Sequence, residues 1–382
     1  MKVVWRTSFF CAAVLASANL WAARHIGFET DAFNRVYPAS FAKSIVFSPA
    51  SFEIDCAVIA ETLETIPKAN VSETMGVVLD FESTYRPILE AYAARTNGFE
   101  VVSARAFCLP ELKHALPAFR QNLQRMYGVE AVRTFPTVGA ESWFRATMEG
   151  AMEDFRLPVD LARTEKFAYY DLVSVTVAWR DPFPTENTRK LKFRPAPDAE
   201  PQSVVCMSDV RRADTWETKE YTLLRLPLKD EAWFYALLPK EGFGLAEARA
   251  DISSVEIDHL LSVMMSDADL HVAHGPCAIV LPRLSLCSRL DFTAALTYFR
   301  IPSRGLRHVA GDLAAREFVQ VAKFSLAEQG VGETPLAHKD ADAVVPLTPD
   351  VKKLVFNRPF LFFVYHERTK TIPIAGQYCG EE

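Results

Sequence analysis

Apolar residues recur along this chain with two periods, which predicts a mixture of helices and strands. One stripe repeats every three to four residues after a Ser-Pro start at 48–49 and consists of Phe52, Cys56, Ile59 and Leu63. Its spacing predicts a deeply packed helix. Residues 99–108 alternate between apolar and polar and predict a strand, and residues 172–179, rich in β-branched side chains, predict a fully buried one.

The later half of the chain continues this mixture. Residues 221–239 predict two strands joined by a polar turn at 229–231. Residues 278–286 predict a further strand and residues 291–299 a helix. Because helices and strands do not alternate regularly, the pattern favours an α+β fold with large, mostly antiparallel sheets.

One long segment near the C-terminus has no apolar period. It separates an alternating stretch that ends at Glu328-Gln329-Gly330 from an aromatic block that begins at Phe356, and it spans about twenty-five residues. Connections longer than about 12–15 residues without structure of their own are uncommon and are usually functional or disordered. We therefore expect two buried strands that support one exposed loop.

The first residues have the pattern of a secretory signal. Lys2 and Arg6 precede an apolar run at 9–15, and small residues follow at 16–18. The run is too short to cross a bilayer, which disfavours a membrane anchor. We therefore expect residues 1–23 to be a signal peptide and the protein to be secreted, or periplasmic in a bacterium.

Composition narrows the functional classes. Hydrophobic residues make up 49% of the chain, which allows a sizeable core, and the net charge of −6 argues against general nucleic-acid binding. Six of the seven cysteines lie beyond residue 23, without a C-x-x-C spacing, so we expect mostly buried free thiols and no zinc framework.

No motif nominates a catalytic centre, cofactor or metal. The chain has no G-x-S-x-G, and the sequence after Gly330-x-Gly332 breaks any phosphate-loop pattern. His271 and His274 are three residues apart on a predicted strand, where their side chains would point to opposite faces. We therefore expect neither an enzyme nor a metal site.

A basic cluster consists of Arg189, Lys190, Lys192 and Arg194. Such a cluster can bind a polyanion such as a glycosaminoglycan. A charge run is more often the solvated face of a strand. The sequence leaves both interpretations open and favours the second.

Five segments in a fixed order carry a resemblance to a known family. They are IVFSPAS at 45–51, WRDPF at 179–183 with ENT at 186–188, LPRL at 281–284, E-x-G at 328–330, and FNRPFLFF at 356–363 with Gly376. Over nearly all of residues 24–382 the chain resembles the serpins. The resemblance implies a single monomeric domain with three mostly antiparallel sheets, about eight or nine helices and a reactive loop presented to a protease.

In inhibitory serpins the protease cleaves this loop, which then inserts as a new central strand while the protease is still acyl-linked. The resemblance therefore implies a suicide inhibitor of a serine or cysteine endopeptidase. Family spacing from Gly330 places the reactive residue at Val344, and alignment from the C-terminal side places it at Val345. Because Pro346 would resist cleavage after Val345, we predict Val344, whose small side chain suits an elastase-like protease.

The hinge of this loop departs from the inhibitory pattern. It follows Glu328 and Gly330 and contains Val331, Glu333 and Pro335. Whichever set of alternate loop residues faced the core after insertion, charged side chains would be buried. A proline would also remove a ladder hydrogen bond from a central strand. The alternative function is thus a non-inhibitory serpin that acts as a carrier, chaperone or binding protein.

The family's buried cluster that controls opening of the main sheet corresponds to Ser48, Ser51, Asp171 and Gln320. The two serines match, whereas Asp171 and Gln320 replace the usual Asn and His. Either these two residues hydrogen-bond as a compensated pair, or the sheet no longer needs to open quickly. The segment 81–101 is shorter than usual, which predicts a reduced or absent helix.

Overall fold

The computed structural model describes residues 28–29, 31–32, 43–63, 65–96, 98–254, 272–302, 306, 308–311, 313–330 and 351–381. These residues form two hydrogen-bonded sheets and seven α-helices. The helices are α2 (Pro49–Glu61), α3 (Thr65–Met75), α4 (Arg86–Ala93), α5 (Pro117–Tyr127), α6 (Thr137–Thr147), α7 (Leu245–Ser254) and α9 (Thr293–Tyr298). The α+β class is confirmed, with slightly fewer helices in the described ranges than expected.

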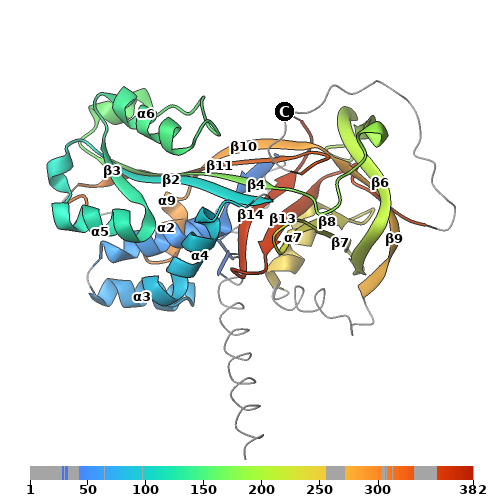
Figure 1. Ribbon diagram of the computed structural model, residues 1–382, viewed down its shortest axis with the longest axis horizontal. Coiled ribbons are helices and arrows are strands. Elements are labelled where there is room, and N and C mark those ends of the chain that lie inside the picture. Colours follow the sequence, from blue (N-terminus) through green and yellow to red (C-terminus); the bar gives the residue numbers. More distant parts are fainter. Residues whose placement is uncertain are drawn as a thin grey trace, which may run out of the picture.

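A five-stranded sheet crosses the middle of the molecule (Figure 1). In order, its strands are β10 (Leu284–Asp291), β11 (Ala315–Leu326), β4 (Phe167–Val177), β2 (Phe99–Leu109) and β3 (Val129–Arg133). Helix α6 covers one face, and α2, α5 and α9 lie on the other. Both faces are therefore buried, which explains why β4 is apolar almost throughout.

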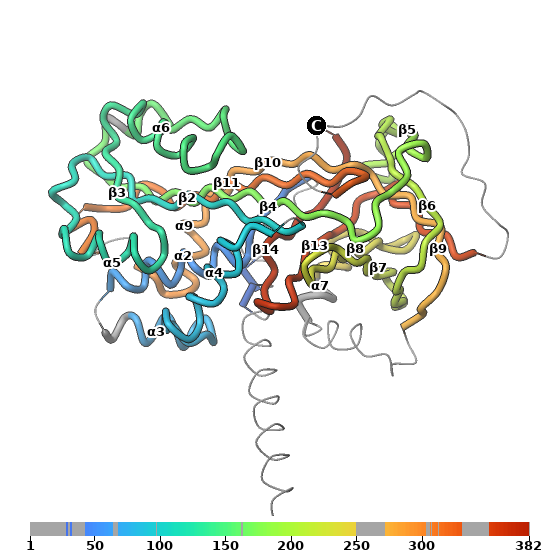
Figure 2. The backbone as a smooth tube through the Cα atoms, viewed as in Figure 1, coloured from blue at the N-terminus to red at the C-terminus, as the bar shows by residue number. Residues whose placement is uncertain are grey.

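The second sheet has nine strands. Its order is β1 (Ile45–Phe47), β14 (Thr371–Tyr378), β13 (Phe360–His366), β8 (Ala232–Pro239), β7 (Tyr221–Pro227), β6 (Gln202–Glu217), β9 (Val272–Pro282) and β12 (Lys352–Val355), with β5 (Arg189–Phe193) also on β6. We expected three sheets, and the described residues form two. The long strand β6 pairs with β5, β7 and β9 and so joins two of the expected sheets into one. Figure 2 shows β5, β6 and β9 at the end of the molecule away from α3 and α5.

One predicted strand is wrong in extent. Residues 278–286 belong to two strands, β9 and β10, which lie in different sheets and meet at Arg283. The Arg283 amide donates to the Val205 carbonyl, and its side chain turns toward Glu328. This change of partners ends one ladder and begins the other, which no apolar period could indicate.

The remaining predictions of local structure agree well with the fold. The strand pair at 221–239 is the β7–β8 hairpin. The short segment that begins at Phe81 holds a five-residue π-helix at Phe81–Tyr85 and the eight-residue helix α4. All six cysteines beyond residue 23 are free thiols, five of them buried. In the described part of the chain, no helix has the length and apolarity to cross a membrane.

Candidate functional site: the seam of the five-stranded sheet

The centre of the five-stranded sheet is a parallel seam. Strands β4 and β11 pair in parallel from Ala315↔Phe167 to Phe324↔Val175. Their outer neighbours, β2 and β10, pair with them antiparallel. Parallel pairing is slightly less stable per residue. A strand placed antiparallel between β4 and β11 would have two antiparallel neighbours.

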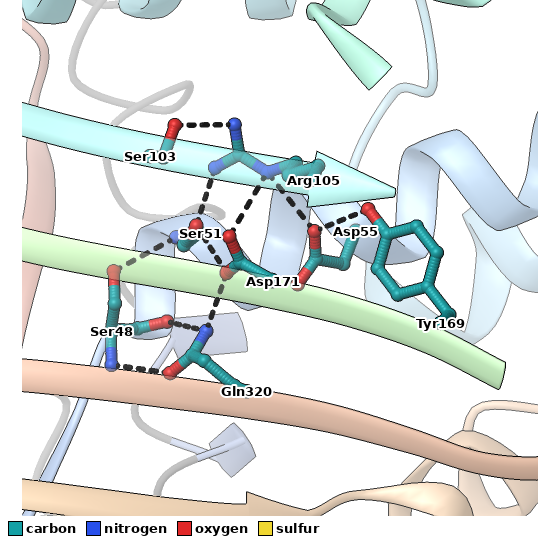
Figure 3. Close-up of polar contacts among 8 residues, drawn as sticks. All are labelled: Ser48, Ser51, Asp55, Ser103, Arg105, Tyr169, Asp171 and Gln320. Atoms are coloured by element: carbon teal, nitrogen blue, oxygen red, sulfur yellow. Dashed lines mark hydrogen bonds and ion pairs between the residues drawn. The ribbon is translucent and has the colours of Figure 1, made fainter. Parts of the chain in front are cut away.

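Helix α2 approaches this seam with its N-terminus. Ser48 is the N-cap, and its hydroxyl accepts from the Ser51 amide at 3.2 Å. The Gln320 amide on β11 accepts from the Ser48 N–H at 2.8 Å and donates to the Ser48 carbonyl at 3.1 Å. Its nitrogen also donates to Asp171 Oδ2 on β4 at 3.1 Å, so one side chain ties the helix to both strands (Figure 3).

A buried ionic network continues from Asp171. Asp171 Oδ2 accepts from the Ser51 hydroxyl at 2.6 Å. Arg105, on β2, places its Nε 3.1 Å from Asp55 Oδ1 and 3.5 Å from Asp171 Oδ1, and also donates to Ser51. The Tyr169 hydroxyl donates to Asp55 Oδ1 at 2.8 Å (Figure 3).

The charges of this network do not balance. Asp55 and Asp171 are fully buried and Arg105 is 4% exposed, so one guanidinium faces two carboxylates. Burial and the nearby Asp171 raise the pKa of Asp55 well above its usual value, against the opposing effects of Arg105 and Tyr169. Burial alone would lower the pKa of Arg105, but the two carboxylates outweigh it and raise that pKa, so Arg105 stays charged.

The structure brings the four predicted cluster residues together, and sequence reasoning missed their partners Asp55, Ser103, Arg105 and Tyr169. A signal was available. Asp55 lies among the apolar residues of α2, and Arg105 lies in the second half of β2 between small and apolar residues. Charges at buried positions need an oppositely charged partner, so the pair could have been proposed.

The start of the long loop is a second rigid point. Trp179 is fully buried, and its Nε1 donates to the Ala327 carbonyl at 2.8 Å. Glu328 accepts from Arg283 Nε at 2.8 Å and from the Thr188 hydroxyl. Although burial acts to raise the pKa of Glu328, these hydrogen bonds lower it below its usual value.

Gly330 is the last described residue before the long loop. It bridges to Ala178 with φ of 124°, and an added Cβ would overlap the Ala178 Cα and the Val177 carbonyl. Only glycine fits such a close approach. The other predicted loop residues, Val331, Glu333, Pro335, Val344 and Val345, and the predicted signal peptide lie outside the described residues.

The basic cluster lies on and just after β5. Lys190, Lys192 and Arg194 are exposed, whereas Arg189 is half-buried on the alternate side of β5. Among the described residues no group of His, Cys, Asp and Glu is arranged to hold a metal, and His274 pairs with Asp214 at 2.6 Å.

Comparison with known proteins identifies this architecture. A family model described as Serpin (serine protease inhibitor) matches residues 24–380. The chain belongs to the serpin family. This serpin is 22% identical over 379 residues to plasminogen activator inhibitor 1 of Bos taurus, covering 92% of this chain and 90% of the bovine protein.

Two further relatives are a viral protein and a protein of known structure. Serine proteinase inhibitor 1 of Myxoma virus (strain Lausanne) is 24% identical, over 58% of this chain and 58% of the viral protein. The crystal structure of uncleaved ovalbumin superposes with a TM-score of 0.77 at 18% identity, covering 94% of this chain and all (100%) of that chain. Serpins are generally protease inhibitors rather than enzymes, and ovalbumin is a non-inhibitory member.

Proposed function

We propose that this serpin presents residues 331–350 to a serine or cysteine protease and inhibits it by inserting the cleaved loop into the β4–β11 seam. The observation that supports this proposal is the turn that connects β11 to the loop. The loop leaves the end of β11 through the Ala327–Gly330 turn, in which each residue's amide donates to the other's carbonyl. A chain that reverses there runs back along β11, antiparallel to both strands of the seam.

Insertion would exchange one parallel ladder for two antiparallel ones. The Gln320 contact with Asp171 crosses the seam and would have to break first, whereas the Gln320 contacts with Ser48 hold β11 to α2. In this proposal the inserted form has the lower free energy, so the uncleaved state is held kinetically, and these contacts contribute to the barrier. Trapping is then a race between opening of the seam and hydrolysis of the acyl-enzyme.

The proposal extends to the whole protein: a signal peptide at 1–23, a single domain at 24–382, and action outside the cell or in the periplasm. The reactive bond follows Val344, or Val345 as the alternative. Valine at this position supports a target with a small aliphatic pocket, such as an elastase-like protease. The protein itself is not an enzyme in this proposal.

The decisive experiment is incubation with an elastase-like serine protease followed by denaturing electrophoresis. We expect a covalent complex that survives denaturation. Val344→Asp is the control, since an acidic residue should not enter an aliphatic pocket. Rapid loop cleavage by the active protease without any complex would contradict suicide inhibition.

A second function, a non-inhibitory serpin that carries or binds another molecule, is favoured by two observations. Glu333 and Pro335 make the hinge a poor central strand. The Arg105 network also ties α2 to β2 and β4, which stiffens one side of the seam. Loop cleavage with neither complex formation nor added thermal stability would support this alternative.

A further inference from the structure

A cavity of about 890 Å³ opens between β5, the β8–α7 connection and the segment before β13. Its volume lies in the range of small-molecule sites, about 300–1,000 Å³. It is separate from the seam, and no residue of the seam network lines it.

Part of the wall of this cavity is apolar and rigid. The segment after β5 contributes Pro195 and Pro197, the β8–α7 connection contributes Pro239 and Phe243, and Pro359 precedes β13. Proline has no N–H to donate and a fixed φ. Such walls offer a preformed apolar surface, which reduces the ordering cost of binding a ligand.

The charged lining is predominantly basic. Four cations, Lys192, Arg194, Lys240 and Arg358, face two carboxylates, Glu241 and Glu247, so the lining carries 4 − 2 = +2. Two of the six are engaged locally. Lys240 Nζ donates to the Thr218 carbonyl at 2.5 Å, and Glu247 accepts from the Gly244 amide at 3.1 Å.

The other three cations form no close ion pair within the described part of the chain. In the ranges that the structure describes, Lys192, Arg194 and Arg358 form no ion pair with Asp or Glu. Half-buried Arg358 donates to the neutral Pro239 carbonyl at 2.6 Å and 2.9 Å. Its other acceptor, Asn357 Oδ1, is also neutral, and Glu241 acts on Arg358 only at longer range. A partly desolvated guanidinium whose direct acceptors are neutral favours an added anion.

We propose that this cavity binds a small organic anion with an apolar body. Its carboxylate, sulfonate or phosphate head would lie beside Lys192 and Arg194, with Arg358 deeper, and its body would pack on the prolines and Phe243. Two members of the basic cluster thus serve a small ligand rather than a polyanion. The inference is independent of protease inhibition and of the loop.

The test is a fluorescence titration of the full-length protein with anilinonaphthalene sulfonate and, in parallel, with phenylnaphthylamine, which has the same rings without the sulfonate. We expect saturable binding of the sulfonate dye and much weaker binding of the neutral one. Lys192→Gln with Arg194→Gln should lower the affinity for the sulfonate dye about tenfold, the loss expected for one to two charge-assisted contacts. Lys190→Gln with Lys353→Gln removes the same charge outside the cavity and should change little.

A blocking variant separates this cavity from other dye-binding surfaces. Ala246 and Ala196 line it and are exposed, so Ala246→Trp or Ala196→Trp should fill it while the near-ultraviolet circular dichroism stays native. Unchanged dye affinity in both folded variants would overturn the proposal. So would loss of heparin retention in the Lys192/Arg194 variant with unchanged dye binding, because that result identifies a polyanion site.

Discussion

At the scale of single residues, Arg105 accounts for most of the unusual chemistry of the seam. It lies between Asp55 and Asp171, and all three are withdrawn from water. Breaking such a pair by removing the cation would leave two buried carboxylates together, at a cost of about 3–5 kcal/mol. Removing one carboxylate instead should relieve the imbalance.

Asp55→Asn should therefore stabilise the protein at neutral pH, by on the order of 1 kcal/mol. The pKa of Asp55 is raised in the folded state. The free energy of unfolding that protonated Asp55 contributes is therefore fully present below the unfolded pKa of about 3.9 and is lost as pH rises through the folded pKa. The gain of the variant should accordingly grow with pH above about 4. Urea unfolding from acidic to neutral pH measures it, and a variant less stable at neutral pH would contradict the charge balance.

His366 should show the opposite pH dependence. It stacks on Phe99 at 4.2 Å between ring centroids, and burial lowers its pKa to about 4. A depressed folded pKa means that stability is present above the unfolded value of about 6.5 and is lost as pH falls through about 4. The loss should approach about 3 kcal/mol.

His366→Phe, which keeps a ring against Phe99, should lack this loss. The measurement is the free energy of unfolding of both proteins across the window from about 6.5 down to about 4. An equal slope in the two proteins would show that His366 does not titrate on unfolding.

At the scale of elements, the seam and the turn that ends β11 act together. Trp179, Glu328 and Gly330 hold the point from which the long loop departs. The loop therefore begins from a fixed position, and the direction in which it leaves is set by this turn. A change there should act on the sheet rather than only on the loop.

Gly330→Ala should destabilise the protein by about 1–3 kcal/mol, because the new Cβ has no space and the backbone lies at positive φ. Gly139→Ala is the matched control: this exposed glycine lies inside α6 with open space around it, so alanine should be neutral or slightly stabilising. Thermal melts of both variants test the contrast. Equal melting temperatures of the two variants would show that the close approach at Gly330 does not require glycine.

At the scale of the whole molecule, the question is whether the fold still holds energy that loop insertion releases. If it does, cleavage within 331–350 should raise the melting temperature strongly, because β4 and β11 would each gain an antiparallel neighbour. Glu333→Thr with Pro335→Ala should then speed insertion, because the first change removes a charge that insertion would bury and the second restores a backbone N–H that can donate in the sheet.

This hinge variant also separates the two proposed functions. A rise in melting temperature after cleavage only in the hinge variant would mean that the native hinge blocks insertion. No rise in either protein would locate the block in the sheet, where the Arg105 network and the Gln320 contacts hold the seam. In that case the non-inhibitory function would be favoured.

The sequence alone determined the family, the α+β class and most elements, because short-range patterns carry them. The helical stripe of α2, the alternation of β2 and the aromatic block at 356–363 each depend on neighbouring residues. It was the family resemblance that placed Ser48, Ser51, Asp171 and Gln320 in one predicted cluster; the local patterns did not. They could not show where the ladder changes partners at Arg283.

Only the tertiary structure decided which charges meet. Asp55 and Arg105 lie fifty residues apart and belong to a helix and a strand, so their ion pair depends on packing rather than on local pattern. The same holds for the cavity, whose walls come from separate segments within 192–201, 239–247 and 357–359 together with Cys379, and which takes in Lys192 and Arg194 but not Arg189 or Lys190. Local periodicity determines which elements form, whereas the long-range packing of those elements determines which buried charges are paired and which cations remain free to bind.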